Sequence, residues 1–289
     1  MLGLVHTLDM LGAVAPGDTS TALTMARALV KQGYRPLFIN SGSKTPAETR
    51  TDAAIKKARK DAQKKAKEKG NPNWEAVDAQ GGGIHLALDT PGKVKGAHDR
   101  ALRRQSVVNG EPAPLNLALA LNGERLLVVD CDTAESVASF TAMAADWGLT
   151  IAHPTVLSPG AQDESGAWKH ANGGHFYFEV PEGFSFADVP KFNVGGSGAD
   201  AVSFMTTGAY VLVPPSRRPE GVYRWLGAVQ TMPQPMIDFV MSHKQKPKDK
   251  ATTRAVAWSD DAGDDIATYL DAVADDGTDI ADWSQSVSW

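Results

Sequence analysis

Apolar runs alternate with polar, glycine-rich and proline-rich breaks along most of this chain. Between residues 115 and 225, five runs have the length and the turn-bounded character of strands: "LNLALAL", "RLLVVDCD", "HFYFEV", "ADAVSFM" and "AYVLVPP". Between the second and the third run, "AESVASFTAMAADWG" has helical spacing, with Phe140, Ala144 and Trp147 on one face and Gly148 as the stop. The pattern predicts a mixed or antiparallel sheet with helices packed on it.

The last two of these runs are separated by "TTG" and together predict a hairpin. One strand would run through Asp200 to Met205, and the other would return to "PPS".

The part of the chain before the strand-rich region has an α/β pattern. "GDTSTALTMARALVKQGYRPLFINSGSKTP" predicts a helix with Asp18, Thr19 or Ser20 as its N-cap and Gly33 at its end, followed by the strand "RPLFI". A turn that carries Lys44 comes next, and "KVKGAHDRALRRQSVV" predicts another helix with a basic side. We therefore expect an N-terminal α/β lobe joined to the sheet, in a fold of the α/β (α+β) class.

Residues 44–69 differ from the rest in charge, with ten Lys or Arg against four Asp or Glu and few apolar positions after Ile55. Two interpretations fit this composition. One is a solvated helix with i,i+4 charge pairs. The other is a basic arm that lies against a phosphate backbone. Charge alone does not distinguish them.

The composition of the chain narrows the class of protein. With 289 residues, 42% of them hydrophobic, the chain can bury the core of one large or two modest domains. A net charge of −5 gives no overall signal for nucleic acid, so such binding would need local basic patches. A single cysteine excludes an intramolecular disulfide and suits a reducing cytoplasm.

No targeting or membrane segment is expected. The N-terminal stretch has no basic region and is interrupted by His6 and Asp9, which argues against a signal peptide. No apolar run approaches the length needed to cross a bilayer. We expect a soluble, cytoplasmic protein.

The C-terminal part is polar and then acidic. After one folded domain over residues 1–242, "KQKPKDKATTRA" predicts a linker over residues 243–256. Residues 257–289 are acidic, with Ile266, Tyr269, Leu270 and Val273 supporting one short helix. This tail is too small to fold alone, so we expect it to dock on the main domain or to begin a longer helical region.

Two carboxylates end the apolar run "LLVVDCDTAES". On a strand, Asp130 and Asp132 would project from one face, about 6.5–7 Å apart, while Cys131 turns to the packed side. Two such carboxylates can jointly hold one or two hard divalent cations. Alternatively, this acidic strand end caps the next helix, with Asp132 or Thr133 as the N-cap.

Further candidates follow along the chain. His175 in "KHANGGHFYFEV" follows two glycines, which let a phosphate approach the backbone, and Lys169 adds positive charge upstream. A plain hairpin turn fits the same residues. Asp200 is either a third carboxylate of a site or an ordinary loop residue. Arg217 and Arg218 are either solvated or directed at nucleic acid.

The order of these elements is more specific than any one of them. From "GYRPLFINSGSKTP" through "LNLALALNGERLLVVDCDT" and "GGHFYF" to "GAYVLVPPS", about residues 15–230, the chain resembles the bifunctional primase-polymerase (prim-pol) family of phages and plasmids. The resemblance implies an archaeo-eukaryotic primase-like catalytic core over residues 1–242, with an RNA-recognition-motif-like mixed sheet. By position, Asp130 and Asp132 match its first motif, His175 its second, and Lys44 with Pro46 its "K.P" turn.

The chain departs from the family pattern in four places, one of which is the loop "LSPGAQDESGAWKHAN", which looks longer than usual. Counting back from "GAYVLVPPS" places Ser203 where the family has an aspartate. Either the hairpin is longer here and Asp200 supplies this ligand, which is the interpretation we adopt, or the third ligand is missing. The serine usual before the second-motif glycines is replaced by Ala171 or Asn172. The basic stretch from Lys56 exceeds the usual spacing and looks like an insertion.

The implied function is a DNA-dependent primase/polymerase that makes and extends primers on single-stranded DNA in phage or plasmid replication. In the family's two-metal nucleotidyl transfer, Mg²⁺ or Mn²⁺ would be held by Asp130, Asp132 and Asp200. His175, with Lys169 or Lys44, would bind and position the nucleotide. His175 and Lys44 have this role by their position in the motifs, whereas Lys169 is a candidate for its positive charge.

The implied partners are a single-stranded DNA template, a primer and nucleoside triphosphates, with a helicase domain or protein as a further candidate and no membrane. The expected location is the cytoplasm, that of the host cell if a phage encodes the chain. Two other classes compete with a polymerase. One is another metal-dependent phosphoryl-transfer enzyme such as a nuclease. The other is a catalytically inactive single-stranded DNA-binding module, which Ser203 favours.

Overall fold

The computed structural model describes residues 19–78, 82–105, 107–108, 111–196 and 198–244. All of them belong to one of the two units into which the chain divides, Met1–Gln245. The predicted acidic tail over residues 257–289 and most of the predicted linker over residues 243–256 lie outside the described residues. The domain boundaries therefore stay a prediction.

The first sheet has three antiparallel strands in the order β1-β4-β12. Their bounds are Arg35–Ile39 for β1, Asn116–Asn122 for β4 and Thr207–Val213 for β12. Helices α2 (Thr19–Lys31) and α4 (Pro91–Arg104) pack against this sheet in one apolar core. The central strand β4 is buried over six successive residues, because helices cover one of its faces and a second sheet covers the other.

The second sheet has seven strands in the order β10-β11-β5-β9-β6-β15, with β16 also paired to β9. All these pairs are antiparallel except β16 with β9, so the sheet is mixed. Its strands are β5 (Leu126–Thr133), β6 (Val156–Leu157), β9 (Asn172–Glu179), β10 (Phe192–Val194), β11 (Val202–Met205), β15 (Arg224–Trp225) and β16 (Gln230–Thr231). The predicted mixed sheet with helices packed on it is confirmed.

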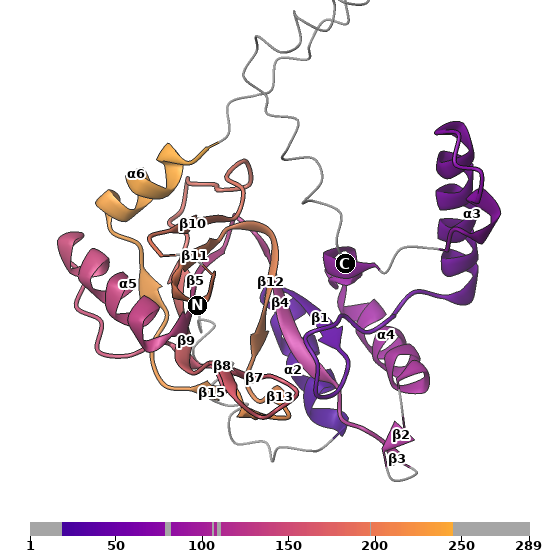
Figure 1. Cartoon of the computed structure of the whole chain (residues 1–289), viewed down its shortest axis with the longest axis horizontal. Coiled ribbons are helices and arrows are strands. Elements are labelled where there is room, and N and C mark those ends of the chain that lie inside the picture. The colour runs from indigo at the N-terminus through magenta and orange to yellow at the C-terminus, as the bar shows by residue number, and fades with distance from the viewer. Residues whose placement is uncertain (1–18, 79–81, 106, 109–110, 197, 245–289) are drawn as a thin grey trace, which may run out of the picture. The chain divides into compact units, whose positions relative to one another are not determined.

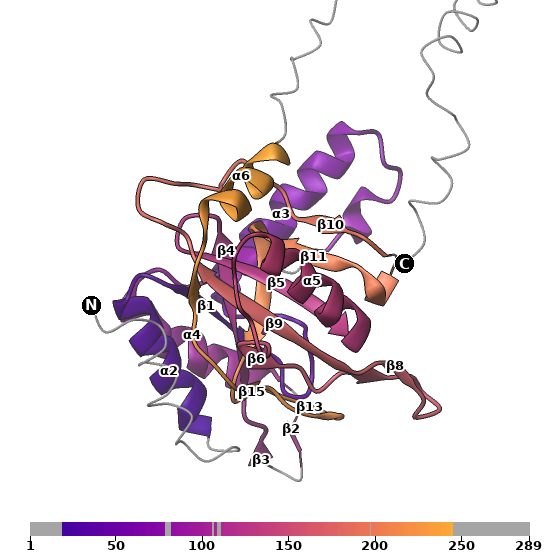
Figure 2. The ribbon, with the colours of Figure 1, turned by 90° about the vertical axis from the view of Figure 1, so that its left-hand side faces the viewer.

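Helices α5 (Ala134–Asp146) and α6 (Gln234–Ser242) cover the outer face of the second sheet. Figure 2 shows α5 lying over β5 and β11. The predicted cap of α5 is present: the Thr133 hydroxyl accepts the Ser136 amide at 3.1 Å, and Ser136 Oγ accepts the Thr133 amide at 3.0 Å. Since Thr133 supplies this cap, Asp132 is left for another role.

The hairpin predicted around "TTG" is wrong. β11 pairs with β5 and β10 in the second sheet, whereas β12 pairs with β4 in the first. The chain changes sheets at Thr206, which is fully buried and donates its hydroxyl to the Val189 carbonyl at 2.6 Å. The strand also begins later than predicted, because Asp200 ends a short 3-10 turn, η3 (Gly198–Asp200).

The remaining elements lie outside the two sheets. Helix α3 (Asp52–Glu68) follows β1 and projects beyond α4 (Figure 1). Short turns and ribbons complete the described chain: η1 (Trp74–Ala76), η2 (Gly83–Leu86), β2 (Val107–Val108), β3 (Glu111–Pro112), β7 (Ala161–Gln162), β8 (Trp168–His170), β13 (Arg217–Arg218) and β14 (Gly221–Val222). Over the described residues, none of the helices has the length and apolar character needed to span a membrane.

Candidate active site

A row of polar residues crosses the second sheet. Ser203 of β11 lies opposite Asp130 of β5, and Asp130 lies opposite His175 of β9. Ser203 also lies opposite Asn193 of β10 and donates its hydroxyl to Asn193 Oδ1 at 2.9 Å. Because opposed residues on neighbouring strands share a face of the sheet, these four side chains form one continuous polar row.

The two faces of β5 belong to different cores, which explains where its carboxylates lie. Leu127 and Val129 pack with α5 and α6, whereas Leu126 and Val128 pack toward the first sheet. Side chains alternate along a strand, so Asp130 and Asp132 continue the face toward the first sheet. Cys131 is fully buried on the other face, and burial raises the pKa of its thiol far above the usual range. The predicted shared face of the two aspartates is thus present.

Each aspartate has a histidine beside it. His175 Nε2 lies 3.3 Å from Asp130 Oδ1, and the two side chains are 7% and 24% exposed. His170 Nδ1 lies 3.6 Å from Asp132 Oδ1, with Asp132 38% exposed. The carboxylates are therefore partly enclosed yet still reachable from solvent, which is the state that a ligand or metal site requires.

Burial and neighbouring charges act on His175 in opposite directions. Desolvation lowers its pKa below the ordinary value; the Asp130 carboxylate opposes this shift and Lys44 adds to it. Its Nε2 lies 3.3 Å from Asp130 Oδ1, whereas its Nδ1 is buried without a hydrogen-bond partner among the described residues. The His175 ring is thus held close to the Asp130 carboxylate.

A hollow of about 360 Å³ opens where the two sheets separate, and we call it the inter-sheet hollow. Asp130 and His175 line it from the second sheet, and Tyr210 lines it from β12. Lys44 and Lys191 bring positive charge to its wall. The Lys44 turn is fixed in place, because the Tyr210 hydroxyl donates to the Lys44 carbonyl at 3.0 Å. One carboxylate and two ammonium groups therefore share a space large enough for a phosphorylated ligand.

Three predicted site residues are not part of the lining of this hollow, and one of them is Asp132, which follows Asp130 on the same face of β5. Asp200 Oδ1 accepts the Thr133 hydroxyl at 3.0 Å, so it sits beside the start of α5 rather than in the strand row. Lys169 is exposed on β8, where its charge helps to lower the pKa of Asp163, and it is not part of the lining of the hollow. The roles predicted for these residues stay predictions.

Several residues around the hollow are not predicted from the sequence. Lys191 and Tyr223 line it, and neither is among the candidate site residues. Arg218 is neither solvated nor directed outward: its side chain is 17% exposed, and Nη2 lies 3.3 Å from Oε1 of Glu220, which is 7% exposed. Burial raises the pKa of the neighbouring Tyr223, and the Arg218 charge opposes that shift. Only tertiary structure reveals this buried ion pair.

Asp130 and Asp132 fit a hard divalent cation, although they do not form a closed cage. Within the part of the chain that the structure describes, no three His, Cys, Asp or Glu side chains gather closely enough to hold a metal by themselves. Mg²⁺ retains several waters and is often bound by one or two carboxylates together with substrate phosphates. Two partly exposed carboxylates on one face beside an open hollow meet that requirement.

Comparison with known proteins agrees with this geometry. A search of curated proteins finds no match. The model of the family described as "Bifunctional DNA primase/polymerase, N-terminal" matches residues 26–236, a span that contains β1, both sheets and every candidate residue named above. The chain therefore belongs to the bifunctional DNA primase/polymerase (Prim-Pol) family.

Proposed function

We propose that this chain catalyses template-directed nucleotidyl transfer, making and extending primers on single-stranded DNA. The observation that carries the proposal is the pair Asp130 and Asp132 on one face of β5, with Asp130 lining a hollow whose wall also carries Lys44 and Lys191. Membership of a primase/polymerase family implies DNA and nucleotides as substrates. The arrangement of charges suits a triphosphate, because it combines carboxylates for metal ions with cations for phosphate oxygens.

In this proposal the carboxylates bind metal ions and the lysines bind phosphates. Asp130 and Asp132 hold the divalent ions, and Asp200 is a third candidate ligand. When bound, Mg²⁺ or Mn²⁺ would lower the pKa of the attacking hydroxyl and neutralise charge that develops on the phosphate. Lys44 binds and orients the phosphates, with Lys191 as a second cation on the same wall.

His175 supports this arrangement in two ways. Its Nε2 lies 3.3 Å from Asp130 Oδ1, so the ring confines the position of that carboxylate. Its ring also lines the hollow, where it can contact a phosphate of the nucleotide. Lys169 remains a nucleotide-binding candidate only if β8 moves toward the hollow when substrate binds.

Finer features belong to the same proposal. The second sheet would correspond to the RNA-recognition-motif-like sheet of archaeo-eukaryotic primases, and the chain would act in phage or plasmid replication in the cytoplasm. A helicase domain or protein would follow it in the replication machinery. The predicted linker over residues 243–256 would connect the catalytic part to that region.

Nucleotide incorporation on a single-stranded template tests the proposal, with each metal and with and without primer. We expect Asp130→Asn and Asp132→Asn to lower the rate by at least about 10²–10³-fold, as the loss of one preorganised electrostatic contact typically does. Asp200→Asn should have a smaller effect. Asp146→Asn is the matched control, since Asp146 is an exposed aspartate on α5 outside the hollow.

Three other outcomes would contradict the proposal. Full activity in either Asp130→Asn or Asp132→Asn, with normal stability, would remove the site assignment. A shortened template with metal alone would identify a nuclease. Template binding without any product would identify an inactive binding module, and Ser203, which stands opposite Asp130 where the family pattern has an aspartate, would be its first explanation.

A further inference from the structure

Helix α3 carries a dense positive charge on a face that the rest of the described chain leaves open. Residues 52–69 hold eight Lys or Arg against three Asp or Glu, within a chain whose net charge is −5. The helix has no fully buried residue. At 3.6 residues per turn, Lys56, Lys60 and Lys64 follow one another along one face at steps of about 6 Å, with Lys57 beside them. We call these four residues the lysine face.

One flank of α3, next to the lysine face, has neighbours within the chain. Gln63 donates its amide to the Glu75 carbonyl at 2.8 Å, and Arg59 pairs with Asp78 at 2.7 Å. The Lys67 ammonium lies 4.8 Å from the centre of the Trp74 ring. The segment around η1 therefore runs along this flank of α3, and the four lysines of the lysine face remain exposed.

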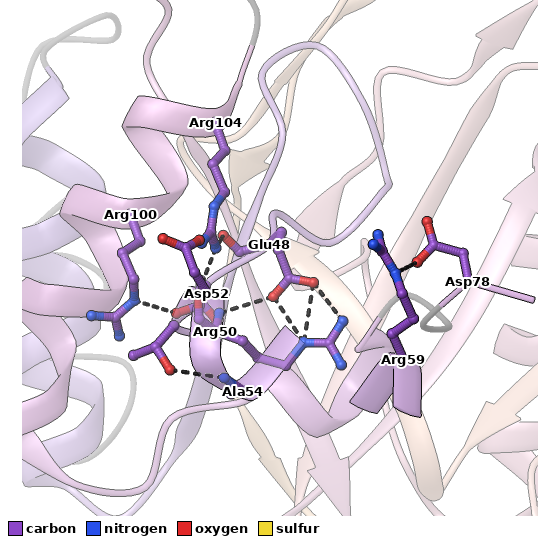
Figure 3. A network of polar contacts seen from close by, with 10 residues as sticks. Glu48, Arg50, Asp52, Ala54, Arg59, Asp78, Arg100 and Arg104 are labelled. Atoms are coloured by element: carbon purple, nitrogen blue, oxygen red, sulfur yellow. Dashed lines mark hydrogen bonds and ion pairs between the residues drawn. The ribbon is translucent and has the colours of Figure 1, made fainter. Parts of the chain in front are cut away.

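The first turn of α3 is anchored to α4 by a network of arginines (Figure 3). Arg104 pairs with Asp52 and also donates to the Arg50 carbonyl. Arg100 donates from Nε to the Thr49 carbonyl at 2.6 Å, and the Thr51 hydroxyl accepts the Ala54 amide as the N-cap. The N-terminal end of α3 is therefore fixed to α4, and Figure 1 shows the rest of the helix projecting beyond α4.

The lysine face has more positive charge than its surroundings neutralise. Within the described residues, Lys56, Lys57 and Lys60 form no ion pair, and Lys64 has only Glu68 at 3.9 Å. Like charges four residues apart destabilise a helix. An external polyanion would relieve that repulsion and release its own counterions on binding.

The chemistry of α3 selects among polyanions. Insertion into a membrane surface needs large apolar side chains opposite the basic face. The opposite side of α3 offers Ala58, Ala62 and Ala66, which instead line a groove together with residues of η2. Lysines spaced regularly along one side, with Ile55 as the one large apolar side chain of the helix, match a nucleic-acid backbone better than a lipid surface.

We propose that the lysine face of α3 binds the phosphate backbone of the single-stranded nucleic acid on which the chain acts. This inference rests on the proposed function for the identity of the strand. Its test, however, is a binding measurement without nucleoside triphosphate or metal ion, so its result does not depend on polymerisation.

The test is the salt dependence of binding of the full chain to a fluorescent oligothymidylate, followed by anisotropy. The variant carries Lys56→Gln, Lys57→Gln, Lys60→Gln and Lys64→Gln. We expect affinity to fall at least about tenfold near 0.1 M salt, and the slope of log affinity against log salt to become shallower by 2–3, because each contact to a single strand contributes about 0.7. Glutamine preserves helix propensity, and circular dichroism checks that α3 still forms.

A matched control removes four lysines elsewhere, with Lys31→Gln, Lys93→Gln, Lys95→Gln and Lys244→Gln. The proposal predicts that this control keeps most of the affinity and the slope of the original chain. Equal losses in the two variants would show a nonspecific effect of net charge and overturn the proposal. Unchanged DNA binding in the α3 variant, with lost binding to phosphatidylserine vesicles, would assign the lysine face to membranes and would also overturn it.

Discussion

Charged side chains occur in this chain in two contrasting surroundings. In the strand row, Asp130 and His175 are 24% and 7% exposed and lie 3.3 Å apart. On α3, Arg59 pairs with Asp78 of a following segment, and the two side chains are 52% and 70% exposed. Most lysines of α3 have no ion-pair partner among the described residues. The first region uses few charges at fixed positions, and the second uses many charges on an open helix.

The surroundings of a charged group determine what its charge can do. A partly enclosed charge interacts strongly with its neighbours, because water screens it poorly, so its position and protonation are tightly set. An exposed charge interacts weakly with any one neighbour but adds to a long-range field that salt screens. The sheet row therefore suits chemistry at one point, and α3 suits capture of a long polyanion.

The largest stability effect should come from the enclosed region, at the Arg218–Glu220 pair behind the hollow. Arg218→Ala would leave the Glu220 carboxylate, 7% exposed, without its cation. We expect a loss of about 3 kcal/mol in the free energy of unfolding, measured by urea denaturation, because breaking a buried pair strands the remaining charge. Replacing both residues, as Arg218→Met with Glu220→Leu, should cost less. A loss below about 1 kcal/mol for Arg218→Ala would show that the pair is effectively solvated.

A smaller effect is expected in the pH dependence of stability. The pKa of His175 is lowered by burial in the folded chain, so below the ordinary value near 6.5 the unfolded chain binds a proton that the folded chain does not. Stability should be complete above about pH 6.5 and should decline as the pH falls toward the lowered pKa. Urea midpoints between pH 5 and 8 measure this decline, and His175→Gln should flatten it. An equal decline in His175→Gln would assign it to other groups.

The smallest effect is expected at the exposed pair on α3. Arg59→Ala should change the free energy of unfolding by less than about 1 kcal/mol, since the ion pair with Asp78 is well exposed. Added salt should reduce even that difference. A loss in the free energy of unfolding as large as that of Arg218→Ala would contradict the difference between the two regions, because it would show that Arg59 contributes to stability as a buried residue does.

The strands and the capped helices could be predicted from the sequence because their signals are local. The apolar runs of β4, β5, β9, β11 and β12 are each bounded by turn residues. Thr133 is a typical N-cap residue directly before α5. The choice of sheet is not local. The residues around Thr206 look like a hairpin turn, yet the chain changes sheets at this buried threonine and β12 pairs with β4.

The site shows the same division. The period of a strand places Asp130 and Asp132 on one face without any knowledge of the fold. The position of His175 beside Asp130 depends on the register of β5 with β9, which cannot be predicted from the sequence. The position of Lys191 on the wall of the hollow depends on the path of a distant loop, which cannot be predicted either. Arg218 and Glu220 are two residues apart, but only tertiary packing buries them as a pair.

In the proposed function, Asp130 and Asp132 together hold the divalent ions of nucleotidyl transfer. The most direct measurement is Mn²⁺ binding, followed by electron paramagnetic resonance, to the original chain, to Asp130→Asn/Asp132→Asn and to the Asp146→Asn control, each with and without a nucleoside triphosphate. We predict protein-bound Mn²⁺ in the original chain and the control, strengthened by nucleotide, and its loss in the double variant. Equal binding of Mn²⁺ by all three would contradict the account.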